Sequence, residues 1–497
     1  MKIKILSLSL FALFILTSCI KDQGSYDVKD LGTPTITTFS KGNAVIGEPY
    51  IIKPVIDYKD ISENDFEYFW FANLSDFSTS DTLSHEKNLS FVFTKAGWYI
   101  GVYQIKNKKT GGITSKIFDF NVVSKYQMGW LILSEKNGNS VLSYSRLNSG
   151  NVDTTFVDIY SSLYGANKLG KGPLSLGRHY TDQADQILVV QNGEGGSVEL
   201  DGTNFSKVIT TDKEFVDGVY PTGFKPIKAE YGDRIEMVVG EDGRAFTRIR
   251  TSSSVFQGAR YSTTPIGNAK ITKTYYKYGQ GYILMYDDLN HRIIGIQDLP
   301  QLYTGKLLYT KMDPLGENVA EFTDLANIGT DAKLIYTGSY VASSNRYFVQ
   351  ILKKGSKYRI QKFLLRLETA IQTLYVIKGT ESDFAGNGIV TDNTHYFLTG
   401  SQYLFFGEGN SLYYYDFDLN TVKKYTTFTG KVTAIESNSE KNQIGVGMDN
   451  GEFYVLDVSN EVLASGTAKI IAKATNLGTV ADIQFKYGKY SSFTSQK

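Results

Sequence analysis

The four histidines have the chemistry that is easiest to recognise, because imidazole nitrogens bind transition metals such as zinc. They are His85, His179, His291 and His395, and they lie far apart in the sequence. No two of them have a His-x3-His or His-Glu-x2-His spacing, which would place two ligands on one face of a helix. We therefore interpret them as surface or turn histidines, and we predict neither a metal site nor a cofactor.

A second candidate metal site is the segment 416–420, which opens like a calcium loop with Asp416 and Asp418 at alternate positions. An EF-hand loop needs a glycine at its sixth position and a glutamate at its twelfth. Thr421 and Thr427 occupy these positions here. The segment is therefore predicted to be a strand end followed by a turn.

Covalent and acid–base catalysis have no recognisable motif in this chain. It contains neither the Gly-x-Ser-x-Gly elbow of serine hydrolases nor the Gly-x4-Gly-Lys-Ser/Thr loop that binds phosphates. A glycosidase needs two carboxylates about 5–10 Å apart, and the 51 Asp and Glu residues could supply such a pair from distant segments. We predict no catalytic residue and no enzyme, and a surface hydrolase with a hidden carboxylate pair remains the alternative.

Tyrosine is abundant, with 35 residues, and its ring could stack on a sugar or hold a peptide. Two groups lie in stretches that could line one face of the fold: Tyr160, Tyr164 and Tyr180, and Tyr275, Tyr276 and Tyr278. Packing between strands is the simpler interpretation for each of these rings. The ligand-binding residues therefore stay unknown at this stage.

Cys19 is the only cysteine in the 497 residues, and the residues before it have the order of a secretory signal peptide. Two lysines come first, and residues 5–16 then form an apolar run that is too short to span a membrane. The Leu-Thr-Ser-Cys ending resembles the bacterial lipobox, whose cysteine is lipidated and becomes the mature N-terminus. We predict a lipoprotein signal peptide over residues 1–18 and a lipidated tether over residues 19–32.

Export and anchoring limit what the mature chain can do. Without residues 1–18 it has no second cysteine for a disulfide, and its formal charge changes from +1 to −1. A near-neutral chain is a poor partner for nucleic acid. The charged stretch after Cys19, which includes Lys21 and Asp22, resembles the surface-export signal of Bacteroidetes lipoproteins. We therefore expect a lipid anchor in the outer membrane, with the protein facing the cell exterior.

The composition predicts an all-β fold, because aromatic residues suit pleated surfaces and the 47 glycines suit turns. Residues 33–125 contain short alternating strands around Trp70 and Trp98, which is the pattern of an Ig-like sandwich. Both tryptophans are predicted to be core anchors. One short helix is predicted from Gly316 to Ala326, where apolar residues recur at three-residue spacing.

A repeated pattern fills residues 126–497: an apolar run, a turn rich in Gly, Asn or Asp, and a second run. Seven such hairpins occur, at residues 130–144, 187–200, 235–247, 282–296, 347–360, 403–415 and 444–456. Propeller blades run to about 40–50 residues, and the longer intervals would contain inserted loops. Residues 432–435 would be the inner strand of the last blade, and residues 481–485 would complete the first blade. We predict a seven-bladed β-propeller, with a sandwich array or an irregular solenoid as the alternative.

Several segments together resemble the PKD-like lipoproteins of Bacteroidetes. They are the lipobox, Ser25-Tyr26-Asp27, the run from Phe66 to Trp70, Ala96 to Tyr99, and Gly129 to Glu135. A true PKD domain carries a Trp-x-Phe-Gly-Asp-Gly segment, whereas Phe71-Ala72-Asn73-Leu74 follows Trp70 here. The resemblance therefore supports only a divergent PKD-like domain.

The resemblance implies a non-catalytic accessory role beside a SusC-like TonB-dependent transporter and its SusD-like lipoprotein. The implied ligand is a nutrient oligomer, either an oligopeptide or a glycan, and further surface lipoproteins are possible partners. An adhesive or structural lipoprotein is the other alternative. The residues themselves predict only a tether, a spacer domain and a rigid ring with variable loops.

Overall fold

The computed structural model describes residues 32–39, 41–74, 80–148, 151–165, 168–180, 185–249, 259–277, 279–299, 304–400 and 402–487. It divides the chain into two compact units, Met1–Val122 and Val123–Lys497. Cys19 and the tether before Gly32 lie outside the described residues. Within the described part of the chain, no helix is long and apolar enough to cross a membrane.

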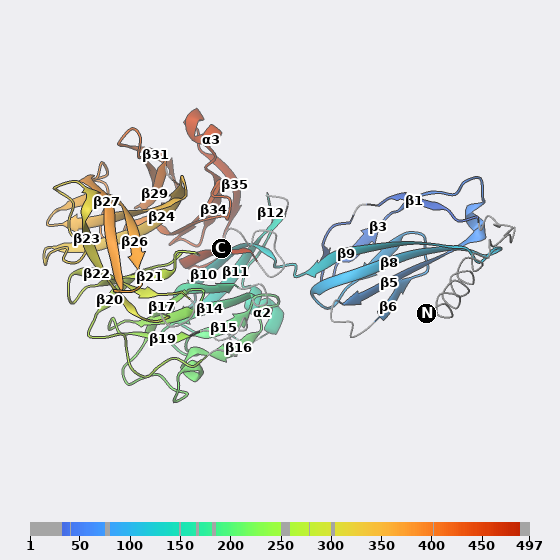
Figure 1. Cartoon of the computed structure of the whole chain (residues 1–497), viewed down its shortest axis with the longest axis horizontal. Coiled ribbons are helices and arrows are strands. Elements are labelled where there is room, and N and C mark those ends of the chain that lie inside the picture. The colour runs from blue at the N-terminus through green and yellow to red at the C-terminus, as the bar shows by residue number, and fades with distance from the viewer. Residues whose placement is uncertain are drawn as a thin grey trace, which may run out of the picture. The chain divides into compact units, whose positions relative to one another are not determined.

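The first unit is a β-sandwich (Figure 1). Its larger sheet has the order β2 (Ala44–Val45), β9 (Ile113–Val123), β8 (Gly97–Asn107), β5 (Phe66–Leu74) and β6 (Ser80–Ser84). Two smaller antiparallel pairs are β1 (Thr35–Thr38) with β4 (Val55–Asp57), and β3 (Pro49–Ile52) with β7 (Leu89–Val92). Side chains of β1, β3 and β7 join those of β5, β8 and β9 in one apolar core.

Only one of the two tryptophans anchors this core. Trp70 is fully buried, stacks on Tyr103 with ring centroids 4.0 Å apart, and donates from Nε1 to the carbonyl oxygen of Glu86. The prediction for Trp98 is wrong, because this side chain is 45% exposed. Along β8 the buried positions are Gly97 and the alternate residues from Gly101 onward, so Trp98 falls on the outward face of the strand.

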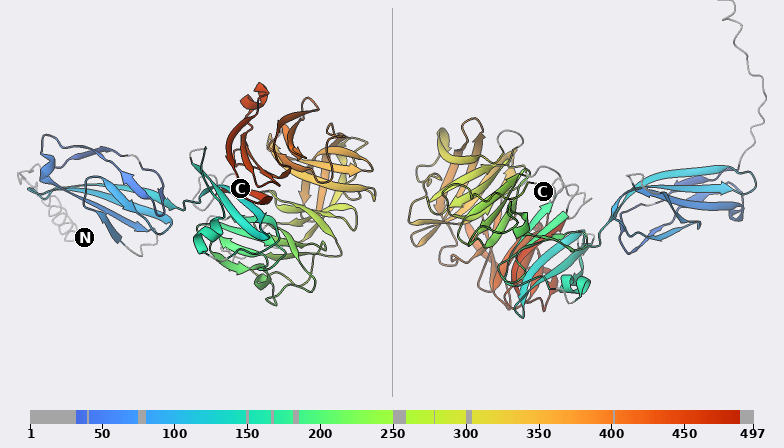
Figure 2. Two further views of the ribbon diagram at one scale, coloured as in Figure 1. Left: turned by 180° about the vertical axis from the view of Figure 1, so that it is seen from behind. Right: turned by 90° about the horizontal axis from the view of Figure 1, so that it is seen from below.

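The second unit is a seven-bladed β-propeller (Figures 1 and 2). From the inner strand outward, blade 1 consists of β36 (Thr479–Tyr487), β10 (Met128–Lys136), β11 (Asn139–Asn148) and β12 (Asn151–Phe156). Blade 2 consists of β13 (Pro173–Tyr180), β14 (Asp185–Gln191), β15 (Val198–Asp201) and β16 (Lys207–Thr210). Blade 3 consists of β17 (Pro226–Tyr231), β18 (Ile235–Gly240) and β19 (Ala245–Ile249). Blade 4 consists of β20 (Ile271–Tyr275), β21 (Tyr282–Asp287), β22 (Arg292–Gln297) and β23 (Leu307–Asn318). Blade 5 consists of β24 (Ala332–Ala342), β25 (Asn345–Lys354), β26 (Lys357–Glu368) and β27 (Thr373–Asp383). Blade 6 consists of β28 (His395–Leu398), β29 (Tyr403–Glu408), β30 (Ser411–Asp416) and β31 (Thr421–Thr427). Blade 7 consists of β32 (Val432–Ser437), β33 (Gln443–Met448), β34 (Phe453–Asp457) and β35 (Lys469–Ala474).

The inner strands form a ring around a channel. β36 contacts β13 on one side and β32 on the other. β13 in turn contacts β17, and further contacts join β32 to β28, β28 to β24, and β24 to β20. The remaining junction is made by Thr274 of β20, whose Oγ1 donates to Glu230 of β17 over 2.7 Å. The last strand closes the ring, because β36 pairs antiparallel with β10, with Ile132 opposite Ile483. Such closure removes a free strand edge.

The seven predicted hairpins are the second and third strands of the seven blades. These strands are buried on both faces, as β18 and β21 are at every residue, because each blade packs between two others. That is why they appear in the sequence as continuous apolar runs rather than as alternating ones. In the first hairpin, Asn137 and Gly138 both have positive φ, 53° and 72°, as a two-residue hairpin turn requires.

Two local expectations had different outcomes. Asp416 does end β30, and its Oδ1 accepts from the backbone N–H groups of Asp418 and Leu419, so the turn there is confirmed. The helix predicted from Gly316 to Ala326 is wrong, because β23 continues to Asn318 and turns follow. The three-residue spacing instead places Phe322 and Leu325 in the core beneath blades 4 and 5.

In addition, β23 and β27 pair in parallel and join blades 4 and 5 into one eight-stranded sheet.

The short helices lie between these strands. They are α2 (Ile159–Tyr164), α3 (Asn460–Ser465), and the 3-10 turns η1 (Glu63–Asp65) and η2 (Thr211–Glu214).

Candidate ligand site in the propeller channel

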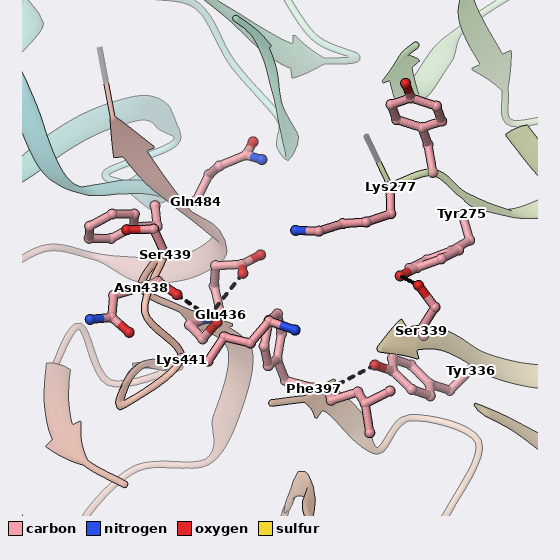
Figure 3. Close-up of a pocket in the computed structure, with 15 residues that line it drawn as sticks. Tyr275, Lys277, Tyr336, Ser339, Phe397, Glu436, Asn438, Ser439, Lys441 and Gln484 are labelled. Atoms are coloured by element: carbon pink, nitrogen blue, oxygen red, sulfur yellow. Dashed lines mark hydrogen bonds between the residues drawn. The ribbon is translucent and has the colours of Figure 1, made fainter. Parts of the chain in front are cut away.

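A cavity of about 270 Å³ opens at the channel of the propeller (Figure 3). Five blades line it, through residues on or just after their inner strands. The lining comprises Tyr275, Tyr276 and Lys277; Tyr336, Gly338 and Ser339; Phe397 and Leu398; Glu436 to Ser439 and Lys441; and Gln484 and Phe485. This volume lies just below the range of about 300–1,000 Å³ that is typical of small-molecule sites.

Two lysines supply the positive charge of the wall. Lys277 follows β20, Lys441 follows β32, and their ammonium groups point into the same space (Figure 3). Within the described residues, neither ammonium forms a salt bridge or a hydrogen bond. The guanidinium of Arg346, on β25, is close enough to act on Lys441, and its Nη1 donates to Ser339 Oγ over 3.2 Å.

The loop after β32 holds Lys441 in place. Oδ1 of Asn438 accepts from the backbone N–H groups of Asn442 and Gln443, each over 3.1 Å. The backbone N–H of Lys441 donates to the carbonyl of Asn438 over 3.1 Å, and Lys441 has a φ of 58°. A side chain other than glycine in this left-handed region is strained by roughly 1–2 kcal/mol. The loop therefore accepts strain at the residue that faces the cavity.

Glu436 is the one carboxylate among the described residues that line the cavity. It lies at the end of β32, and its Oε1 accepts from the backbone N–H of Ser437 over 3.0 Å. Burial in the ring raises the pKa of Glu436 to about 7, against the opposing effects of the Ser437 N–H and Lys277. Burial, with Lys277 as the next cause, also lowers the pKa of Lys441 to about 8. Both groups are therefore balanced between charged and neutral forms near neutral pH.

Tyrosine hydroxyls form the opposite wall. Tyr275 and Ser339 share a hydrogen bond of 2.7 Å, and Tyr336 accepts from the backbone N–H of Leu398 over 2.9 Å. Burial raises the pKa of both tyrosines, so each keeps its proton. Because the Tyr336 oxygen is an acceptor in that bond, its own O–H can still donate.

The structure separates the tyrosines singled out in the sequence. Tyr275 and Tyr276 do line the cavity. Tyr160 and Tyr164 pack against each other on α2, with ring centroids 5.2 Å apart. Tyr160 is part of the apolar core of blades 1 and 2, and Tyr164 packs against that core. The side chain of Tyr180, like Tyr278, lies outside the described residues.

The histidines do not meet at this site. Nowhere in the described ranges do three or more His, Cys, Asp or Glu side chains gather to hold a metal ion. His395, on β28, has a pKa lowered by burial and by Lys273, so it is neutral at physiological pH.

Sequence reasoning missed Lys277, Glu436 and Lys441. Each lies at or just beyond the end of an inner strand, and an isolated charged residue there looks like an ordinary surface position. The one signal is Glu436, which directly follows the apolar residues of the predicted strand 432–435.

A second polar cluster is buried between blades 2 and 3. Arg248 donates from Nη1 to Glu214 over 2.7 Å and from Nε to Glu236, and Tyr231 donates to Glu199 over 2.5 Å. All three carboxylates are at least 95% buried, and burial raises the pKa of Glu199 and Glu214. Because Arg248 and Tyr231 hold all three carboxylates in buried hydrogen bonds, we interpret the cluster as structural.

Comparison with known families gives one match. Residues 19–173 match the PKD-like family. The match covers the sandwich and the strands β10, β11 and β12 of blade 1, and it agrees with the resemblance seen in the sequence. No curated protein matches the chain.

Solved structures resemble the chain only distantly. A quinonprotein alcohol dehydrogenase-like protein from Bacteroides thetaiotaomicron is 13% identical, with a TM-score of 0.41, over 91% of this chain and 99% of that one. A protein provisionally described as a 6-phosphogluconolactonase, from Bacteroides uniformis, is 13% identical and has a TM-score of 0.48. The similarity covers 72% of this chain and 99% of that one. The β-propeller domain of Cps50 (Swd1) from Myceliophteria thermophila is 9% identical and has a TM-score of 0.36. The similarity covers 60% of this chain and 86% of that one. At these values the propeller assignment depends on the strand pairing described above.

Proposed function

We propose that this protein is a non-catalytic ligand-binding lipoprotein, anchored through Cys19 in the outer membrane and facing the cell exterior. In this proposal it is an accessory subunit of a SusC/SusD-like TonB-dependent uptake complex for oligopeptides or glycans. The observation that carries the binding role is the channel cavity, in which five blades present lysines, tyrosines and one carboxylate to a common space. Ligand sites commonly combine such an aromatic lining with a few convergent polar groups.

The start of the family match is consistent with the anchoring part of the proposal. The match begins at residue 19, the cysteine that the lipobox resemblance marks as the mature N-terminus. A rigid ring is also suited to holding a ligand beside a transporter, because its site is preorganised on strands rather than on long loops.

The test is affinity purification of the tagged, lipidated full chain from its native outer membrane, followed by identification of the proteins that co-purify. We expect a TonB-dependent transporter and a SusD-like lipoprotein in stoichiometric amounts. The control is a Cys19→Ala variant, which cannot be lipidated and should lose the complex. A lipidated protein that purifies alone would contradict the accessory role.

One observation favours a second candidate, a surface hydrolase. Glu436 is a cavity carboxyl whose raised pKa, about 7, suits a general acid. A glycosidase needs a second carboxylate across the bond, and Asp482 on β36 accepts instead from the backbone N–H groups of Leu176 and Ile483. Glycan turnover by the purified protein that is lost in Glu436→Gln would favour the hydrolase over the binding protein.

A further inference from the structure

The ligand class of the channel cavity follows from its charges. Lys277, Lys441 and the nearby Arg346 repel one another, and Glu436 alone among the described lining residues opposes them. Lys277 lowers the pKa of the buried Lys441, and the single carboxylate of Glu436 cannot balance two ammonium groups where water is excluded. An anion placed between Lys277 and Lys441 would remove that repulsion and would satisfy two ammonium groups that have no partner in the described chain.

The other lining residues define the rest of the ligand. Glu436 lies in the same wall, so a compact dianion such as phosphate would be repelled more strongly than a single carboxylate. Gln484 lines the same cavity, and its amide group can form a hydrogen bond with a hydroxyl. The rings of Tyr275 and Phe397 provide apolar faces, and the Tyr336 hydroxyl provides a donor. A ring that carries both hydroxyls and one carboxylate meets all of these groups.

We propose that the channel cavity binds a carboxylated sugar, a uronic acid unit, with its carboxylate between Lys277 and Lys441. This inference rests on the proposed binding function and selects an acidic glycan over a peptide as the ligand. Glu436 and Gln484 accept hydrogen bonds from the sugar hydroxyls, and the tyrosine wall faces the ring.

The binding is expected to depend on pH. The groups that face Lys441 and Glu436 are Lys277 after β20, Arg346 on β25 and Asp482 on β36. As the pH rises from 6 to 9, Glu436 gains a negative charge through its pKa of about 7. Over the same range Lys441 loses a positive charge through its pKa of about 8. Both changes weaken the attraction for an anion, so affinity should fall with rising pH.

The experiment is isothermal titration calorimetry of the full-length protein with galacturonic acid oligomers and with the same oligomers methyl-esterified at the carboxylate. We expect binding of the free acid and a loss of about tenfold or more for the ester, which corresponds to about 1.4 kcal/mol. Lys277→Gln and Lys441→Gln should each weaken binding of the acid by about tenfold. Lys423→Gln, which removes the same charge from the exposed strand β31, should leave it unchanged.

Three results would overturn the inference: equal binding of acid and ester, no binding of either by the folded protein, or tighter binding of inorganic phosphate or of an acidic peptide at the same lysines. Folding of each variant is checked by its thermal transition. A negative result here, together with a transporter and lipoprotein in the affinity purification, would reject the uronic acid and leave the proposed uptake role intact.

Discussion

At the residue scale, Lys441 links the stability of the propeller to its binding site. Its φ of 58° would suit glycine, and its ammonium lies beside Lys277 and Arg346. Both features are unfavourable for folding, yet both place a cation at the cavity. Strained residues of this kind concentrate at functional sites.

The prediction is that Lys441→Gly stabilises the protein by about 0.5–1 kcal/mol, because relief of left-handed strain exceeds the added chain entropy of glycine. The same variant should lose most of its affinity for an acidic sugar. Chemical denaturation measures the first effect and calorimetry the second. Lys423→Gly is the matched control, since glycine within strand β31 should cost about 0.5–1 kcal/mol. A destabilised Lys441→Gly protein would show that the loop gains from the lysine in some other way.

At the scale of elements, apolar cores shared by neighbouring blades hold the propeller together, and two further kinds of buried contact between blades can be tested. One is the polar cluster around Arg248 between blades 2 and 3. The other is close packing where a glycine on the second strand of one blade faces the inner strand of the next. A Cβ at Gly407 would lie 2.4 Å from Val432 Cγ1, and a Cβ at Gly447 would lie 2.4 Å from Val480 Cγ1.

For the polar cluster, Arg248→Met is expected to destabilise the propeller by about 3–5 kcal/mol, because Glu214 and Glu236 lose their buried partner. The loss should be smaller at pH 5 than at pH 8, since burial raises the pKa of Glu214 and its protonation removes part of the uncompensated charge. Urea denaturation at both pH values measures this. Arg244→Met, which breaks an exposed ion pair with Asp242, should cost less than about 1 kcal/mol. Equal losses in the two variants would contradict the role of burial.

For the blade contact, Gly407→Val should destabilise the protein by about 1–3 kcal/mol, because the new side chain overlaps Val432. Thermal unfolding of the full chain is the measurement. Gly400→Ala in the same blade is the control, since nothing lies within 4 Å of a Cβ built there. An unchanged transition in Gly407→Val would mean that blades 6 and 7 can move apart without cost.

At the scale of the whole molecule, the propeller unit depends on its last strand. β36 supplies the inner strand of blade 1, lines the channel cavity and contacts both neighbouring inner strands. Its residues Val480, Ile483 and Phe485 are at least 95% buried. Burial of each such side chain contributes about 1.5–3 kcal/mol, and its removal would leave the edge of β10 free to pair with other chains.

Deletion of residues 479–497 is therefore expected to abolish the cooperative thermal transition of the propeller and to cause aggregation. Differential scanning calorimetry and size-exclusion chromatography follow the two effects. The control removes only residues 488–497, beyond the end of β36, and should behave as the full chain does. A folded, monomeric protein without β36 would show that ring closure is dispensable.

The sequence by itself determined most of the fold. Hairpins such as 130–144 have local signatures, because strands that are buried on both faces are continuous apolar runs and their turns need Asn or Gly. The inner strand at 432–435 and the closing strand at 481–485 followed from the blade repeat. The face of the sheet on which each side chain lies was harder to predict. Trp98 and Trp70 belong to the same sheet, but Trp70 faces the core and Trp98 faces outward.

Only the tertiary structure decided the site. Lys277, Glu436 and Lys441 come from blades 4 and 7, and they meet because the ring brings the ends of the inner strands to one channel. Nothing in their local sequence specifies that meeting, just as nothing local specifies the parallel pairing of β23 with β27. Local patterns determine which segments become strands, whereas closure of the ring determines which side chains share a cavity.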